Sequence, residues 1–341
     1  MNRRKQKYTD DGKQDRLSDL PDSVVLHILS FFATKEAVQT CILSKRWKNL
    51  WKFLTTLTLS TRHFETVRPF TKFVSHVLSH RDDSTTLQAL DFHRAGNVEP
   101  YLLKKIVKYA VSHSVQRLRV NVTAHILCFP PCFFSCNTLT SLNLSLISGT
   151  LFPKYLDLPA LTILSLQRFD FCSSDDGRVK PFLAFKMLNS LIIDNCMVHD
   201  ARQSLCISSP KLVNLTILTG FFTYFEIELS VPSLHTFSFT GQTMLKIYGS
   251  KSNLSSIKHV NIHLRHVRDS VETSLVLLSW LVEFASIESL TVSLDALEVL
   301  YSHVWFWQEN FHFIFTLNFI NTTCIKLILI LPDGLGSFLS S

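Results

Sequence analysis

The residues best suited to chemistry in this chain are three cysteines and a neighbouring histidine. Cys128, Cys132 and Cys136 are each separated by three residues, and His125 lies just before them. Zinc prefers thiolate and imidazole ligands, but its sites favour tighter C-x2-C knuckles with a second pair further along the chain. Two prolines between the first two cysteines also disturb any helical spacing that would align them. We therefore predict no metal and interpret the cysteines as buried free thiols, with a zinc site as the alternative.

Catalytic motifs are the next possibility. His263 and His266 are three residues apart, but the first lies on a predicted strand, so the two would not share a helical face. A catalytic nucleophile needs an oriented base and an oxyanion hole. The chain contains no G-x-S-x-G, no H-E-x-x-H and no G-x-x-x-x-G-K-[ST] motif. The sequence therefore predicts no enzyme and no cofactor.

An amphipathic helix is predicted near the N-terminus. Leu20, Val24 and Ile28 recur every four residues, so one face of this helix is apolar. Pro21 is expected at the first helical position, where a missing N–H costs nothing and φ is already helical.

Two further short helices are predicted before residue 52. Thr34 can cap the second, with Glu36 in its first turn, where the helix dipole favours an acid. Val38 and Ile42 belong to its apolar strip, and Ser44 can cap the third helix. Three helices of this size bury little surface alone, so the unit is expected to need a partner surface.

The order of residues in this segment resembles the F-box motif, in the form common in plant F-box proteins with leucine-rich repeats. The matching runs are L-P-x6-I-L-S-F, T-K-E-A-V-x-T and L-S-K-R-W-x-x-L-W. The chain departs from the usual pattern at Phe32, Ala33 and Cys41, where Leu, Pro and Ser are common. The resemblance implies docking on the adaptor subunit of a cullin–RING ubiquitin ligase. The residues expected to contact the adaptor or to shape that surface are Leu20, Pro21, Ile28, Leu29, Val38, Trp47 and Leu50.

A second pattern, apolar-x-x-apolar-x-apolar, returns ten times after the F-box. Its first positions step by 33, 28, 24, 22, 27, 24, 22, 23 and 30 residues, and most steps lie in the range of leucine-rich repeats. The first, second and last occurrences fit least regularly. The ten begin at Leu54, Leu87, Val115, Leu139, Leu161, Leu188, Leu212, Leu234, Ile257 and Ile287.

The spacing of this pattern has a physical reason. Its last two apolar positions are two residues apart, so both face the core from one short strand. Stacked repeats bury one continuous core, and their parallel strands line a concave face. We therefore predict an α/β protein, with a three-helix F-box followed by a leucine-rich-repeat solenoid. The residues beside the last apolar position are expected to face outwards and bind a target protein; they include Asn143, Ser145, Ser165, Gln167, Asp194, Thr216, Ser238, Thr240, Asn261 and His263.

Composition and charge restrict the partners. The 341 residues carry a net charge of +7, but apart from an N-terminal cluster the basic residues are spread out, which argues against nucleic-acid binding. The N-terminus lacks the apolar core of a signal peptide. The eight cysteines are therefore expected to be free thiols in a reducing compartment, in the cytoplasm, the nucleus or both.

The chain divides into four expected parts. These are a disordered basic tail (1–14), the F-box (15–53), the solenoid (54–300) and an irregular C-terminal cap or truncated tail (301–341). Many members of the family carry a further domain after the repeats, whose pattern is not found in Tyr301–Ser341. Phe311–Leu331 has the length of a membrane span, but polar interruptions favour one or two last strands over a membrane anchor.

The hypothesis that follows is a substrate-recognition subunit of an SCF-type cullin–RING ubiquitin ligase. The F-box would bind the adaptor, and the repeats would hold an unidentified target protein. The alternative is a repeat scaffold whose F-box is not functional and which joins no ligase. Neither membrane nor nucleic acid is expected as a partner.

Overall fold

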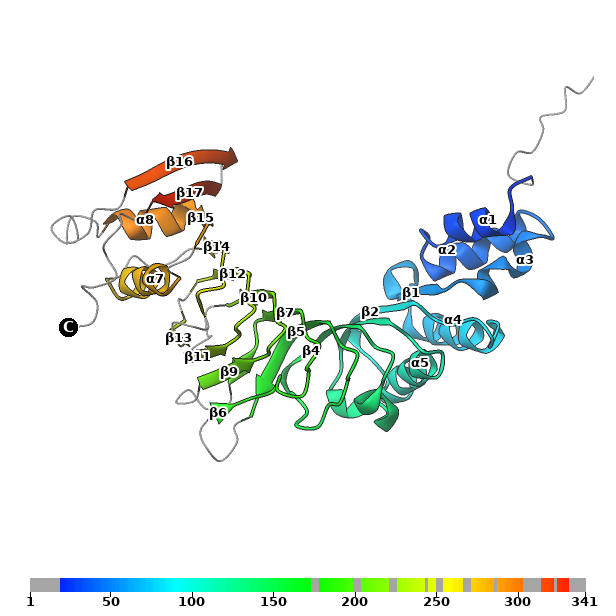
Figure 1. Ribbon diagram of the computed structural model, residues 1–341. Coiled ribbons are helices and arrows are strands. Elements are labelled where there is room, and N and C mark those ends of the chain that lie inside the picture. Colours follow the sequence, from blue (N-terminus) through cyan, green and yellow to red (C-terminus); the bar gives the residue numbers. More distant parts are fainter. Residues whose placement is uncertain are drawn as a thin grey trace, which may run out of the picture.

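The computed structural model describes residues 19–172, 178–198, 204–220, 226–242, 245–249, 254–265, 271–284, 287–302, 314–321 and 324–330. The chain forms an arc, with small helices at one end and a long curved sheet along its inner side (Figure 1). The predicted disordered tail, residues 1–14, lies outside the described residues.

Short helices form the N-terminal unit, as predicted. Pro21 immediately precedes the first helix instead of starting it, and its carbonyl oxygen accepts bonds from the N–H groups of Val24 and Val25. Helix α2 begins at Thr34, and the carboxylate of Glu36 accepts a bond of 3.1 Å from the N–H of Ala33. The elements are α1 (Asp22–Leu29), α2 (Thr34–Gln39), η1 (Thr40–Ile42), α3 (Trp47–Leu50) and η2 (Trp51–Phe53).

Thr34 does not cap its helix, contrary to the prediction. Its side chain is buried, and its Oγ1 accepts a bond of 2.8 Å from the N–H of Thr58 in the first strand of the solenoid. Trp51 and Leu54 are buried in the same continuous core as the repeats. The partner surface that the three helices need is therefore supplied in part by the chain's own first repeat.

The main sheet confirms the predicted repeats. Each of the ten apolar patterns supplies one strand, including the three that fit least regularly, and these ten strands pair in parallel and in chain order. The two strand positions of every pattern are buried. The ten strands are β1 (Thr56–Ser60), β2 (Ala89–Asn97), β3 (Arg117–Thr123), β4 (Ser141–Leu151), β5 (Ile163–Phe171), β7 (Ser190–Asp194), β10 (Asn214–Leu218), β12 (Thr236–Gly241), β14 (His259–Leu264) and β15 (Ser289–Ser293). A short strand, β8 (Met197–Val198), pairs with β5.

The outer side of the arc explains why the repeats differ in length. Repeats of 33, 28 and 30 residues return through helices, namely α4 (Val67–His80), α5 (Pro100–Ser112) and α7 (Val271–Glu283). Several shorter repeats return through a second parallel sheet of β6 (Arg178–Val179), β9 (Ser204–Ser208), β11 (Glu226–Ser230) and β13 (Ile247–Gly249). The strand rises more per residue than a helix does, so it spans the outer layer with fewer residues. The remaining short elements are η3 (Thr61–His63), η4 (Ile126–Cys128), η5 (Pro131–Ser135) and α8 (Leu294–Ser302).

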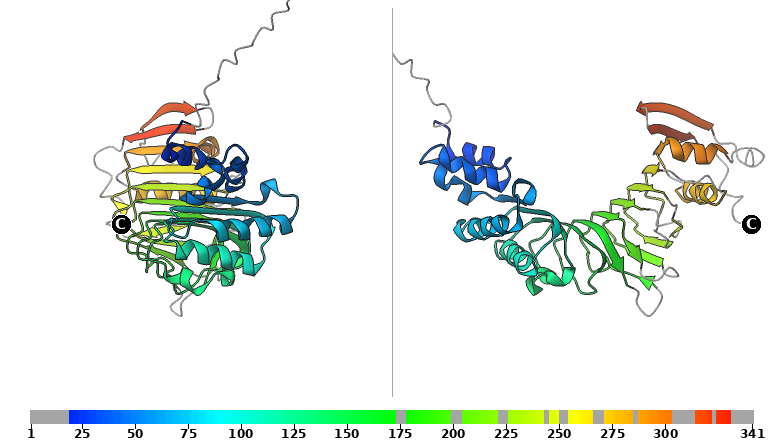
Figure 2. Two further views of the ribbon diagram at one scale, coloured as in Figure 1. Left: turned by 90° about the vertical axis from the view of Figure 1, so that its right-hand side faces the viewer. Right: turned by 180° about the vertical axis from the view of Figure 1, so that it is seen from behind.

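Two further strands extend the sheet at its C-terminal end. β17 (Cys324–Ile330) pairs antiparallel with β15, and β16 (Ile314–Asn321) pairs antiparallel with β17. Both lie at the end of the stack of strands in Figure 2. This arrangement agrees with the one or two last strands that the sequence predicts for this segment. Among the described residues, no helix has both the length and the apolar character needed to cross a membrane.

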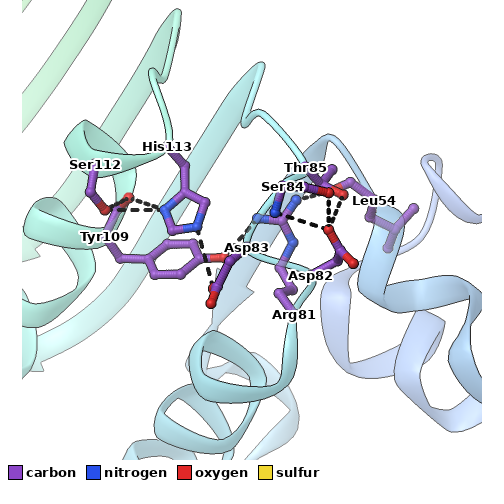
Figure 3. A network of polar contacts seen from close by, with 9 residues as sticks. All are labelled: Leu54, Arg81, Asp82, Asp83, Ser84, Thr85, Tyr109, Ser112 and His113. Atoms are coloured by element: carbon purple, nitrogen blue, oxygen red, sulfur yellow. Dashed lines mark hydrogen bonds and ion pairs between the residues drawn. The ribbon is translucent and has the colours of Figure 1, made fainter.

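A buried arginine connects the F-box to the repeats (Figure 3). Arg81, at the end of α4, donates hydrogen bonds to the carbonyl oxygen of Leu54 and to the hydroxyl of Tyr109, the latter at 2.9 Å. The ring of Tyr109 stacks on that of His113, with 3.9 Å between ring centroids. Burial raises the pKa of Tyr109, although the neighbouring Arg81 guanidinium opposes that shift. Arg81 thus holds the end of the F-box against the outer helices of the first two repeats.

Replacing Arg81 with glutamine is expected to lower the free energy of unfolding by about 2–3 kcal/mol, because the Leu54 carbonyl and the Tyr109 hydroxyl lose a charged donor. The matched control is Arg68→Gln, an exposed arginine on the same helix, which should change stability by less than about 0.5 kcal/mol. Urea denaturation of the full chain measures both. Equal midpoints for the two variants would show that Arg81 does not stabilise the junction.

Candidate functional site

The first candidate surface is on the F-box, where a salt bridge connects the start of α1 to the residue before α3. The guanidinium of Arg46 donates to the Asp22 carboxylate at 2.6 and 2.8 Å, and also to the carbonyl oxygen of Leu20. The N–H of Trp47 donates to the Ser44 hydroxyl at 3.4 Å, but α3 begins at Trp47 and its N-cap is Arg46, so Ser44 is not the cap that the sequence predicts. The bonds of Arg46 therefore connect the starts of α1 and α3.

The predicted adaptor-binding residues divide into two groups. Leu29, Trp47 and Leu50 are buried in the F-box core. Leu20 and Val38 are half-buried against that core. Pro21 is exposed and Ile28 is half-buried, so both remain available at the surface. Whether any of them contacts an adaptor stays a prediction.

Several large apolar side chains of the F-box are exposed, which the sequence pattern does not predict. Phe31 is 77% exposed, Ile42 84% and Leu43 63%. Val24 and Phe32 are also exposed. Ile42 in particular was expected in the apolar strip of α2, but it follows that helix at the end of η1, where the change of backbone turns its side chain to solvent. Exposed apolar side chains of this size are candidates for a protein–protein contact.

The second candidate surface is the concave face of the main sheet. The register aligns the predicted outward residues in two rows: Asn143, Ser165, Ile192, Thr216, Ser238 and Asn261 in one, and Ser145, Gln167, Asp194, Leu218, Thr240 and His263 in the other. Ser145 is only 5% exposed, so the expectation that it faces outwards is wrong, and target binding by the other residues stays a prediction. Their alignment means that an extended partner could contact the same rows over several repeats.

Hydrogen bonds connect part of the second row. The hydroxyl of Ser145 donates to the side-chain oxygen of Gln167, and the Gln167 amide donates to the Asp194 carboxylate at 2.7 Å. The amide of Asn195 donates to the same carboxylate at 2.8 Å. In the first row the Asn261 amide donates to the Ser238 hydroxyl at 3.0 Å. These bonds hold the polar side chains in fixed positions. None of the side chains they join is a nucleophile hydrogen-bonded to a general base.

The cysteines do not form the considered zinc site. Within the described part of the chain, no group of three or more His, Cys, Asp or Glu residues could hold a metal ion. Cys136 is buried, Cys128 is half-buried and Cys132 is exposed, and all three are free thiols. The prediction of buried thiols is therefore correct for Cys136 and wrong for Cys132, because η5 turns that side chain to solvent.

The thiols should react at very different rates with iodoacetamide. Burial raises the pKa of Cys196 to about 12, so at pH 8 only about one molecule in ten thousand carries its reactive thiolate. Burial also raises the pKa of Cys206, whose thiol lies 3.1 Å from the Glu228 carboxylate. We expect Cys132 to be alkylated first and Cys196 and Cys206 only on unfolding, as measured by peptide mass spectrometry. Early labelling of Cys196 in the folded chain would contradict the burial argument.

Comparison with known proteins shows which proteins this chain resembles. The family model for the F-box domain matches residues 17–56. An F-box/LRR-repeat protein of Arabidopsis thaliana is 30% identical over 317 residues, which is 84% of this chain and 68% of the relative. An F-box/FBD/LRR-repeat protein of the same plant is 28% identical over 214 residues, or 60% of this chain and 49% of the relative. An FBD-associated F-box protein, also from Arabidopsis thaliana, is 22% identical over 312 residues, covering 85% of this chain and 67% of the relative.

The helical unit and the parallel sheet together define an F-box protein with leucine-rich repeats. The chain belongs to the plant F-box/LRR-repeat family. It spans between 36% and 68% of the length of the curated relatives it matches.

Proposed function

We propose that this protein is the substrate-recognition subunit of a cullin–RING ubiquitin ligase. The F-box would bind the adaptor subunit, and the concave face of the repeats would bind a target protein. The observation that carries this proposal is the division of the apolar F-box residues into a buried group and an exposed group. Leu29, Trp47 and Leu50 close its core, while Phe31, Ile42 and Leu43 remain exposed without a covering element from the described chain. A surface of this kind fits an apolar partner.

The mechanism we propose is proximity, without bond-making by the chain itself. A target held on the concave face gains a high effective concentration near the ubiquitin-loaded enzyme that the ligase carries. The continuous core from Val25 to Val299 supports this role, because it joins the F-box to the repeats without a flexible linker between them. The expected location is the cytoplasm, the nucleus or both.

Co-purification of the full chain with the purified adaptor tests the proposal. The wild-type chain should form a stable complex, and the Leu20→Ala/Pro21→Ala variant should bind less, because it removes surface at the start of α1. Circular dichroism shows whether each sample is folded. A folded wild-type chain that does not bind would identify the protein as a repeat scaffold outside any ligase.

A further inference from the structure

A depression of about 330 Å³ lies on the concave face beside the F-box. It is formed by the first four strands of the sheet, β1 to β4, together with the residue that follows α1. Its polar lining includes Ser30, Thr58, Asp91, Arg117, Arg119 and Asn143. None of these except Asn143 was selected from the sequence.

The depression carries excess positive charge. Arg117 and Arg119 are two apart on β3, so both side chains face outwards, while Leu118 and Val120 are buried beneath them. Arg119 lies 3.7 Å from the carboxylate of Asp91, and its side chain remains 61% exposed. Arg117 is exposed, and the described residues give it no carboxylate partner. Two arginines against one aspartate leave one net positive charge.

This charge distinguishes the F-box end from the rest of the concave face. The residues that continue the row of Arg119 across the sheet are uncharged: Asn143, Ser165, Ile192, Thr216, Ser238 and Asn261. The row, which begins with Thr58 and Asp91, therefore has one anion-attracting position at Arg119, followed by uncharged side chains as far as Asn261. An extended segment with one acidic end fits this arrangement.

We propose that the depression binds a carboxylate side chain in an acidic segment of the target protein. This inference rests on the proposed function, because it assigns the chemistry of the target that the repeats would hold. The forked guanidinium of Arg117 suits bidentate contact with a carboxylate. The Thr58 hydroxyl and the Asn143 amide supply further donors, and the rest of the segment lies along the uncharged row from Asn143 to Asn261.

Fluorescence anisotropy with a labelled decaglutamate peptide and the full chain tests the inference. The Arg117→Gln/Arg119→Gln variant should bind about tenfold more weakly, since hydrogen bonds to charged groups are lost. The Asp91→Asn variant should bind more tightly, because it removes the acid that neutralises Arg119 and repels the peptide. Unfolding would weaken peptide binding in both variants. Weaker binding of the arginine variant together with tighter binding of Asp91→Asn therefore cannot come from unfolding.

The matched control is Lys104→Gln/Lys108→Gln, which removes the same charge from exposed positions on α5, at the outer side of the arc. Its affinity for the peptide should equal that of the wild type. An equal loss in the control, or no binding of decaglutamate by the wild type, would overturn the inference. So would displacement of the peptide by inorganic phosphate but not by chloride at the same ionic strength, because the site would then be a small-anion site.

Adaptor binding is measured in the same samples. The arginine variant should keep it, since the changed residues lie on the sheet. Loss of adaptor binding in every sample would count against the ligase proposal alone, whereas intact adaptor binding without peptide binding would count against the acidic segment alone.

Discussion

Replacing Trp280 with alanine is expected to destabilise the C-terminal repeats by about 3–5 kcal/mol, the usual cost of removing a fully buried tryptophan. Trp280 is on α7, on the outer side of the arc, and is 1% exposed. Its ring stands edge-on to Phe237 and Phe239, at 5.6 and 5.0 Å between centroids. Its indole N–H also donates a bond of 3.0 Å to the carbonyl oxygen of Leu245. Alanine would leave both a cavity and an unpaired buried carbonyl.

The loss should be local because a solenoid repeat contacts mainly its neighbours. Hydrogen exchange measured by mass spectrometry should show faster exchange in β10, β12 and β14, and unchanged exchange in β1 to β4. Uniformly faster exchange in all strands would contradict this local effect and would show that the arc unfolds as one unit.

Two controls separate the contributions of the Trp280 side chain. Trp280→Phe keeps an aromatic ring in the core but removes the donor to Leu245, so its cost should be smaller than that of alanine. Leu275→Ala, at an exposed position of the same helix, removes apolar volume outside the core and should cost less than about 1 kcal/mol. A similar cost for Leu275→Ala and Trp280→Ala would mean that helix propensity, and not packing, explains the effect.

The strands of the main sheet could be predicted because their signal is local and repeated. Leu142 and Leu144 by themselves show the two-residue period of a strand. The nine similar patterns indicate that such strands stack side by side. The return elements could not be predicted in the same way. Leu277, Trp280 and Phe284 are buried at helical spacing, but apolar residues also fill many other positions of α7, and the two-residue strand β6 is too short to show a period. Their structure is decided by packing on the sheet, which a local pattern does not contain.

The F-box surface shows a second limit of prediction from the sequence. The sequence correctly identifies apolar residues on short helices, but it does not say which face the first repeat covers. The bond between Thr34 and Thr58 and the burial of Trp51 define that face, and both depend on a strand that follows the F-box in the chain. Trp47 therefore belongs to the core, and Ile42 belongs to the surface. The charged depression beside the F-box was missed for a similar reason, because Asp91 and Arg119 meet only when β2 and β3 pair.

The F-box variants with the largest expected effect are those that place charges on its exposed apolar residues. Changing Ile42 and Leu43 together to aspartate should weaken adaptor binding more than about a hundredfold, because burying each aliphatic side chain contributes roughly 1.5–3 kcal/mol. Both side chains are exposed, so the variant should remain folded with an unchanged Tm. Isothermal titration calorimetry with the purified adaptor measures the loss.

The control for this variant uses residues with nearly the same exposure on the repeats. Leu127 is 85% exposed and Leu183 is 63% exposed, against 84% for Ile42 and 63% for Leu43. The Leu127→Asp/Leu183→Asp variant adds the same charge but should keep full adaptor affinity. Trp47→Ala, in contrast, should lose binding together with the stability of the F-box, because it removes a core residue. Full adaptor affinity in the Ile42→Asp/Leu43→Asp variant would place the contact elsewhere on the F-box, while equal losses in both aspartate variants would attribute the effect to net charge.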